Sequence, residues 1–504
     1  MFKEIIMSFV QLFSEPTLIF MALFGTAVGV LLGSIPGLDS TVGCALGIPL
    51  TYAMSTDQAF IFLATMYIGA VYGGQIPAIL FRIPGASEAV MTSLDGYPLT
   101  KKGKADIALG TGLFSSVIGS LFGVVVLVLI AIPLAKIALE FGPAEYFALA
   151  ILGLTAIASL GGGSVIKGLI SGLLGLLLAT LGIDALSGIS RFTFGSRMLM
   201  SGISFIPAVI GFFAVSEVYR QIYNNPDLSN FRISPSSSFH KKVSIRLPPS
   251  VELKRIAPII AVGSLVGVCI GILPGTGATT AAIIGYSVAI RMSKHPEKFG
   301  TGIIDGIAAC ESANNAAVGG ALVPLLTLGI PGSATTAVML GAFMIHGLTP
   351  GPLFLINDRP LLFTIATGMI LGSLLIIPIG ALMTKSFLYI SKASYPLLAL
   401  GILIFSGVGA RATGDYYGMY TMYILAVMGF FLEMYGFPVG PVVIGLILGP
   451  IAENSLRRAL IITNGNWLPV ISRPITAVLL ILSLLSLLFS IIQSYKFYKK
   501  MKSI

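Results

Sequence analysis

The sequence predicts an all-α integral membrane protein that crosses the bilayer many times and contains two homologous repeats. Hydrophobic residues make up 56% of its 504 positions and charged residues only 10%, whereas soluble domains average about 25% charged residues. Several apolar runs approach or exceed the ~18 residues of a spanning helix, for example Ile107–Ile132 and Pro474–Ile492. Pro-Gly pairs interrupt apolar segments at matching places in the two halves, which predicts broken or re-entrant helices.

The net charge of +10 indicates basic cytoplasmic loops, because lysine and arginine are enriched on the inner side of membrane proteins. No basic soluble module with interleaved aromatic residues occurs, so we expect membrane lipid and not nucleic acid around the chain. Cys44, Cys269 and Cys310 lie in apolar context, which favours packing over disulfides. The first apolar run has no clear small-residue cleavage site, and no cleavable signal peptide is expected.

The first repeat is predicted at residues 1–218. Its first apolar segment, Thr17–Gly33, ends at a Pro-Gly break, and Leu46–Met54 is too short to cross the bilayer. Ala59–Leu80 ends at a second break, and Asp95-Gly96-Tyr97-Pro98 is expected to form a turn in the polar stretch that follows. Four spanning candidates come next: Ile107–Ile132, Tyr146–Leu160, Val165–Leu181 and Phe205–Val218.

A basic linker at residues 219–255 separates the first repeat from a second repeat with C-terminal helices at 256–504. Four predicted crossings separate this linker from Lys101–Lys104, so both basic loops are expected in the cytoplasm. The motif Gly449-Pro450-Ile-Ala-Glu453-Asn454 is interpreted as a helix-end cap and interfacial anchor. We expect about 10–14 crossings in all. The later spanning candidates are Leu361–Met383, Pro396–Val408, Met419–Phe431 and Pro474–Ile492.

Three landmarks recur in the same order in both halves. Gly33-Ser-Ile-Pro36-Gly37 matches Gly271-Ile-Leu-Pro274-Gly275, and Ile83-Pro84-Gly85 matches Ile330-Pro331-Gly332. The pair Gly73-Gly74 matches Gly319-Gly320, which makes the offsets 238, 247 and 246 residues. Broken apolar segments at matching positions of two halves indicate a transporter's binding site.

The four breaks are therefore the predicted substrate site. Broken backbone at membrane depth survives only where it is buried or lines a wet cavity. Hydroxyl residues follow each break, and free N–H groups at a helix start attract anions, so a carboxylate could bind there without buried lysines. Plain packing kinks are the alternative. The predicted substrate-binding residues are Pro36, Gly37, Ser40, Thr41, Arg82, Pro84, Gly85, Ser87, Pro274, Gly275, Thr276, Pro331, Gly332 and Ser333.

Glu311, Asn314 and Asn315 are the predicted ion-coupling residues. Their spacing places both amides on the face of Glu311. A carboxylate and two amide oxygens are ligands for Na⁺ or an acceptor for H⁺, and acidic residues inside membrane segments are functional by default. A structural hydrogen-bond network is the alternative. Asp305, just upstream, is expected to be more exposed than these three residues. No cofactor is expected.

Other intramembrane candidates are Asp39, Glu88, Asp95 and His346. His346 suits a turn-holding side chain as well as a proton relay. Arg82 could face an anionic substrate, but the pattern favours an interfacial snorkelling arginine. Enzyme signals are poor: Thr413-Gly-Asp415 resembles the turn of an intramembrane aspartyl protease, but Ala412 stands where a glycine is needed. An ion channel is also disfavoured, because repeated broken helices fit alternating access better than an open pore.

Motifs along most of the chain resemble one family. In the first half these are Tyr67-Ile-Gly-Ala-Val-Tyr-Gly-Gly74, Ile83-Pro-Gly85, Asp95-Gly-Tyr-Pro98 and Arg191-Phe-Thr-Phe-Gly195. In the second half they are Gly271-Ile-Leu-Pro-Gly275, Glu311-Ser-Ala-Asn-Asn315, Leu328-Gly-Ile-Pro-Gly332 and His346-Gly-Leu-Thr-Pro-Gly-Pro352. Together they resemble the large membrane subunit of the tripartite tricarboxylate transporters, the TctA family. Two departures are Cys310, where a proline is expected, and Arg82, where a neutral residue is expected.

The resemblance implies a secondary transporter of the bacterial or archaeal inner membrane, with many crossings. It would import small carboxylates such as tricarboxylates, together with a small membrane subunit and an extracytoplasmic solute-binding protein. We expect the two repeats to be inverted and the coupling ion to be Na⁺ or H⁺. The alternatives are a carboxylate transporter that acts alone and, less favoured, an anion channel.

Overall fold

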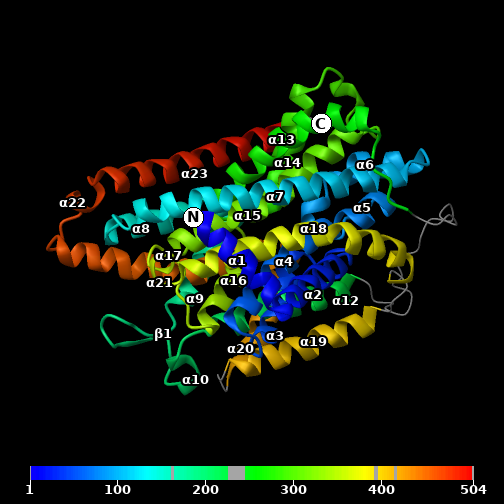
Figure 1. Ribbon diagram of the computed structural model, residues 1–504. Coiled ribbons are helices and arrows are strands. Elements are labelled where there is room, and N and C mark those ends of the chain that lie inside the picture. Colours follow the sequence, from blue (N-terminus) through cyan, green and yellow to red (C-terminus); the bar gives the residue numbers. More distant parts are fainter. Residues whose placement is uncertain (1, 161–163, 225–243, 391–394, 414–416, 502–504) are drawn as a thin grey trace.

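The computed structural model describes residues 2–160, 164–224, 244–390, 395–413 and 417–501, and most of its long helices share one general direction (Figure 1). Among these residues, seven helical segments are long and apolar enough to cross a membrane. They are α2 (Pro16–Gly33), α4 with α5 (Thr56–Gly73, Gln75–Phe81), α7 (Ala105–Ala138), α11 through a π-helical turn to α12 (Phe205–Val209, Ile210–Val215, Ser216–Asn224), α13 (Ser250–Ile272), α18 (Arg359–Ile390) and α21 (Val439–Ile462).

Further apolar helices complete the bundle: α3 (Ser40–Thr51), α8 (Pro143–Leu160), α9 (Val165–Ala179), α16 (Ala334–Ile345), α19 (Tyr395–Ala412), α20 (Gly418–Met434) and α23 (Pro474–Met501). The remaining helices are α1 (Phe2–Ser14), α6 (Thr92–Lys101), α10 (Arg197–Met200), α14 (Gly277–Met292), α15 (Ile304–Leu328), α17 (Phe354–Asn357) and α22 (Leu468–Ile471), with 3₁₀ turns at Ser87–Ala89 and Pro296–Lys298. One antiparallel hairpin pairs β1 (Gly182–Ile183) with β2 (Ser190–Arg191).

Helices α4 and α15 form the centre of the protein. Every residue of α4 from Ala59 onward is buried, and so is all of α15 except its last residue. A helix with apolar or small residues all round has no face for solvent and belongs in a core. Helix α2 packs on α4, whereas α13, α14 and α7 pack on α15, and α18 closes against α2 and α4. Helix α7 of the first half therefore covers the centre of the second half, and α18 does the reverse.

Glycines permit two of these helix pairs to approach closely. On α2 they are Gly25, Gly29 and Gly33, where a Cβ would lie 2.4, 2.3 and 2.1 Å from the carbonyl oxygens of Phe62, Met66 and Ala70. On α13 they are Gly263, Gly267 and Gly271, at 3.0, 2.2 and 2.5 Å from those of Ala309, Ala313 and Ala317. Small residues at such spacing are the usual means of tight helix packing in membranes.

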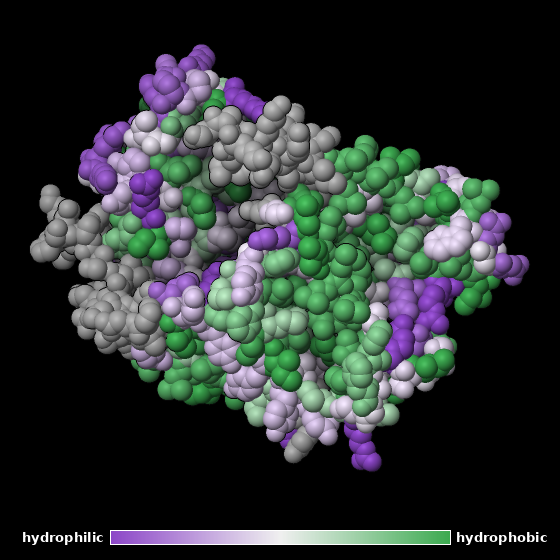
Figure 2. Space-filling view, turned by 180° about the vertical axis from the view of Figure 1, so that it is seen from behind, coloured by the Kyte–Doolittle hydropathy of each residue, from purple (hydrophilic) through white to green (hydrophobic). Residues whose placement is uncertain are grey.

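The surface agrees with a membrane location. Apolar side chains cover the middle of the face in Figure 2, and hydrophilic residues gather toward its ends. Exposed leucines and isoleucines are common on α7, α9, α19 and α23, as expected of helices that face lipid. The prediction of an all-α membrane protein with many crossings is confirmed.

Three local expectations were wrong. Asp95–Pro98 is not a turn but lies inside α6. The Asp95 carboxylate accepts the backbone N–H groups of Gly300, Gly302 and Ile303 at 2.9–3.0 Å, so it binds a distant segment and not the backbone of a local turn. Asp305 is only 5% exposed, since α15 is buried at its first turn and Arg255 reaches it at 2.9 Å. The linker predicted at 219–255 stays a prediction: α12 ends at Asn224, α13 starts at Ser250, and residues 225–243 lie outside the described part.

The third error concerns Gly449–Asn454, which lies inside α21 and ends no helix. Its Glu453 still acts as an anchor. Arg191 of the hairpin pairs with Glu453 at 2.6 Å, and Arg457, one turn further along α21, pairs with Asp184 of the hairpin at 2.5 Å. These two ion pairs hold the hairpin against α21. The sequence did not single out α21 as a crossing, because the charges near its end masked the apolar run.

Candidate functional site

The four Pro-Gly breaks separate α2 from α3, α5 from the 3₁₀ turn at Ser87–Ala89, α13 from α14, and α15 from α16. Within each half the second break lies against the first. A Cβ on Gly85 would be 2.2 Å from the Gly33 carbonyl oxygen, and one on Gly332 would be 2.7 Å from that of Gly271. Glycine is therefore required at both positions for close backbone contact.

Hydroxyl groups join the breaks of one half to those of the other. Behind the first break, Ser40 and Thr41 lie 3.0 and 3.1 Å from the Thr335 hydroxyl, which follows the fourth break. Behind the second, Ser87 lies 3.0 Å from the Thr279 hydroxyl, which follows the third. All four predicted breaks thus gather in one place, although they lie up to about three hundred residues apart in the chain.

The helix starts differ in what they offer an anion. Asp39 caps α3 by accepting the N–H groups of Thr41 and Val42, both at 3.0 Å. Ser333 and Thr336 cap α16 as a capping box. These two starts are already satisfied, which corrects the expectation of free N–H groups at every break.

Helix α14 has no side-chain cap. The hydroxyl of Thr276, its N-cap residue, donates backward to the carbonyl oxygens of Ile270 and Leu273 instead. The first N–H groups of α14, beside the contact between Ser87 and Thr279, are thus the ones open to an anionic group. The rim of this place is accessible: Ser87 is exposed, and so are Ile83 and Leu273 at 43% and 47%.

Arg82 is not brought into this group. It ends α5 in a left-handed conformation with φ 62° and is exposed. Among the residues that the structure describes, no hydrogen bond or ion pair joins it to the other breaks. His346 also lies away from them: it ends α16, is half-buried, and its ring centroid is 5.8 Å from that of Phe60.

Glu311, Asn314 and Asn315 form a second, fully buried cluster on α15. The carboxylate of Glu311 accepts the hydroxyl of Thr92 at 2.5 Å and that of Ser116 at 3.0 Å. The amide nitrogen of Asn315 donates to the Glu311 carbonyl at 3.1 Å and to the Asn314 side-chain oxygen at 2.9 Å. The cluster is rich in oxygen, and no arginine or lysine of the described residues pairs with its carboxylate. A buried carboxylate in such a place requires a proton or a cation.

Glu88 connects the two groups of residues. Its carboxyl oxygens accept from Ser40 at 2.5 Å and from Ser87 at 3.1 Å, at the breaks. Its backbone carbonyl accepts the side-chain N–H of Asn314 at 3.2 Å. Glu88 itself is 5% exposed. The breaks and the Glu311 cluster are therefore in direct contact through one 3₁₀ turn.

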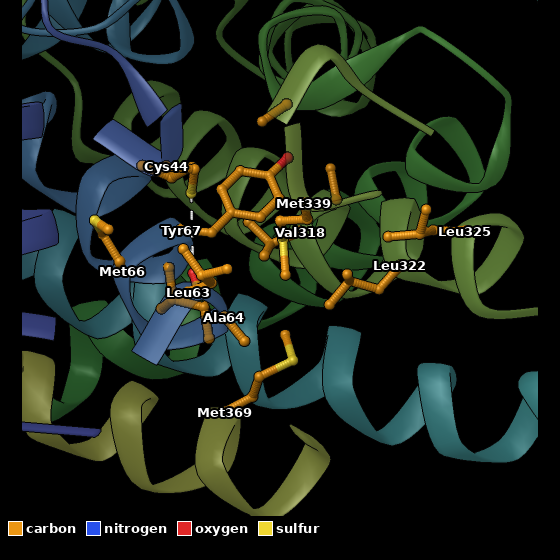
Figure 3. Close-up of a cluster of buried hydrophobic side chains, with 14 of the residues drawn as sticks. Cys44, Leu63, Ala64, Met66, Tyr67, Val318, Leu322, Leu325, Met339 and Met369 are labelled. Carbon is orange, nitrogen blue, oxygen red and sulfur yellow. Dashed lines mark hydrogen bonds between the residues drawn. The ribbon is translucent and has the colours of Figure 1, made fainter. Parts of the chain in front are cut away.

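Several residues of this site escaped the sequence prediction. Tyr67 places its hydroxyl 3.1 Å from that of Ser333, and Figure 3 shows its ring among Cys44, Val318 and Met339. Ser116 and Ser120 on α7 face α15, with Ser120 donating to Asn315 at 3.3 Å. Their four-residue spacing within an apolar run was the available sequence signal. It places both hydroxyls on one face of a membrane helix, where they are expected to hydrogen-bond to a neighbouring helix.

Comparisons with known proteins agree with the motifs. The family model described as "Tripartite tricarboxylate transporter TctA family" matches residues 19–444. The chain is 36% identical over 474 residues to an uncharacterized 52.8 kDa protein in the TAR-I ttuC' 3'region of Agrobacterium vitis, covering 94% of this chain and 93% of that one. A protein in the TAR-II ttuC' 3'region of the same organism is 35% identical over 231 residues, covering 46% of this chain and 96% of that one. No solved structure matches the chain.

Proposed function

The chain belongs to the tripartite tricarboxylate transporter TctA family, and from that premise we propose that it is a secondary active transporter subunit that imports small carboxylates. It works by ion-coupled alternating access in the inner membrane. The observation that carries this proposal is the meeting of four helix breaks from both halves through the contacts Ser40–Thr335 and Ser87–Thr279. A site shared by two halves can open to either side when one half moves relative to the other.

The substrate carboxylate binds where neutral donors converge. The uncapped start of α14 supplies backbone N–H groups, and Ser87 and Thr279 supply hydroxyls beside it. This arrangement fits an anion without a buried lysine. The breaks at Pro36, Pro84, Pro274 and Pro331 shape the site by ending helices there.

The two repeats are part of the proposal, and their glycine interfaces support it. Positions on α2 correspond to those on α13 at an offset of 238, and positions on α4 correspond to those on α15 at 247. The breaks keep these same two offsets, since Pro36 corresponds to Pro274 and Pro84 to Pro331. The offset of 247 pairs Gly73 with Gly320, one residue from the alignment made on sequence alone. We propose an inverted orientation for the repeats.

Glu311, Asn314 and Asn315 take up the coupling ion, Na⁺ or H⁺. Support comes from the complete burial of the Glu311 carboxylate among hydroxyl and amide groups. An ion that enters this cluster changes the charge next to Asn314, which holds the backbone of Glu88 at the substrate site. Ion binding and substrate binding can thus influence each other through direct contacts.

A small membrane subunit and an extracytoplasmic solute-binding protein are proposed as partners. The longest polar stretch, Tyr219–Arg255, has about 37 residues, which is below the ~50 at which independent domains begin. It is also basic and therefore expected in the cytoplasm, on the wrong side for capture. High-affinity capture of substrate is therefore either absent or supplied by another chain, and membership of the family favours another chain.

Reconstitution into proteoliposomes tests these statements. We expect slow uptake of carboxylates at low concentration by the purified chain, and a large increase when both partners are added. A fixed panel of acetate, succinate and citrate should be measured, with Na⁺ and pH gradients imposed separately. Equal initial rates with and without the partners would favour a transporter that acts alone. Uptake that neither saturates nor responds to any ion gradient would favour an anion channel.

A further inference from the structure

Glu88 is an acid in the wall of a site proposed for anions. Its two carboxyl oxygens contact Ser40 and Ser87, whose hydroxyls also meet Thr335 and Thr279 across the halves. Any carboxylate bound at these hydroxyls lies beside the Glu88 side chain. Like charges within ~4–6 Å in a buried site disfavour each other strongly.

The described groups that face Glu88 are acidic or neutral, and the nearby Arg220 guanidinium interacts with Asp39. Its titratable neighbours are Asp39 and Cys44 of the α3 region, Tyr67 on α4 and Glu311 on α15. Helices α14 and α16 contribute hydroxyls, from Thr279 and Thr335. No lysine, arginine or histidine of the described residues forms an ion pair with Glu88. Substrate and a charged Glu88 would therefore add negative charge to an already acidic place.

We propose that Glu88 carries a proton into the cell together with the carboxylate substrate. This inference rests on the function proposed above and makes H⁺ one of its coupling ions. From the outside, the carboxylate of Glu88 takes up one proton when substrate binds, which removes the repulsion. The neutral carboxyl group can then donate its hydrogen to a substrate oxygen or a nearby hydroxyl. After the substrate leaves on the inner side, the same O–H bond breaks and the proton is released there.

The geometry also explains why the carboxyl stays in place in both forms. A carboxylate accepts from both serine hydroxyls, whereas a protonated carboxyl accepts on one oxygen and donates from the other, and hydroxyls can act in either role.

Calorimetric binding of the same carboxylate panel tests the proposal on the intact purified chain. Titration in two buffers of different ionisation enthalpy, at a pH where the ligand is fully ionised, measures the protons taken up on binding. For the wild type we expect uptake of about one proton for each ligand bound. We also expect the affinity for the ligand to fall by up to ~10-fold for each unit of rising pH. For Glu88→Gln, which keeps the shape of the side chain, we expect no proton uptake and an affinity that is independent of pH.

The matched control is Glu140→Gln, which should keep the wild-type proton count, because Glu140 is an exposed acid in the turn that follows α7. Binding by the wild type without proton uptake would overturn the role of Glu88, and this result needs no variant to fold. Unchanged pH dependence in Glu88→Gln would overturn it as well. If the wild type binds none of the carboxylates, the proposed function itself fails, which separates that failure from an error about Glu88.

Discussion

Replacing Gly85 by Ala should disable the transporter, and the same change at Gly332 should do so less severely. The new Cβ on Gly85 would lie 2.2 Å from the Gly33 carbonyl oxygen, with Pro77 and Gly74 at 3.0 and 3.1 Å. On Gly332 it would lie 2.7 Å from the Gly271 carbonyl oxygen and from the Cα of Ala321. Ordinary contact begins at 3.4 Å, so backbone must move at both sites, and further at Gly85.

The size of the effect follows from what obstructs the methyl group. Backbone of the first break, and not a flexible side chain, must give way, and overpacking of this kind costs about 1–3 kcal/mol. We expect Gly85→Ala near the upper end of that range. Displacing the first break also moves Ser40 away from Thr335, so uptake should fall by about tenfold or more, because a misplacement of ~1 Å is costly in a binding site. Leucine at either position should abolish uptake and lower the amount of folded protein.

Thermal unfolding of the detergent-purified variants and uptake in proteoliposomes measure the two effects. Gly401→Ala is the matched control, since Gly401 lies within α19 and a Cβ there meets nothing within 4 Å. It should leave the melting temperature equal or slightly higher, because alanine favours helix over glycine. The reasoning is refuted if Gly85→Ala keeps wild-type stability and uptake, or if Gly401→Ala is as harmful.

Two other predictions concern the ion cluster and the hairpin. Glu311→Gln and Asn315→Ala should lose ion-driven accumulation, because each removes a charge or an oxygen ligand; uptake under separate Na⁺ and pH gradients measures this, and folded variants that still concentrate substrate contradict the assignment. The backbone N–H groups of Ser187 and Leu186, together with Arg457, hold the pKa of Asp184 well below its usual range. A lowered pKa means that this contribution to stability is present above about pH 4 and is lost as the pH falls further. Protease cleavage of the hairpin should therefore increase in acid. The variant Asp184→Asn should be cleaved more readily than the wild type near neutral pH and should depend less on pH, because only the Glu453 carboxylate then remains to pair with Arg191 and Arg457.

The sequence alone determined the class of the protein and its family. Apolar composition, run length and the Pro-Gly pairs are local properties, and they predicted an all-α membrane chain with interrupted helices. The family expectation is confirmed by the match over residues 19–444.

Only the tertiary structure decided which groups meet. The contact between Ser40 and Thr335 joins residues 295 positions apart, and no local pattern encodes such a partner. Asp95 illustrates the same point, since its turn-forming sequence lies in a helix once backbone N–H groups more than two hundred residues away bind its side chain. The place of Glu88 between the breaks and the Glu311 cluster also arose from helix packing. Hydrogen bonds between distant segments depend on how helices pack in space, and local sequence constrains that packing only weakly.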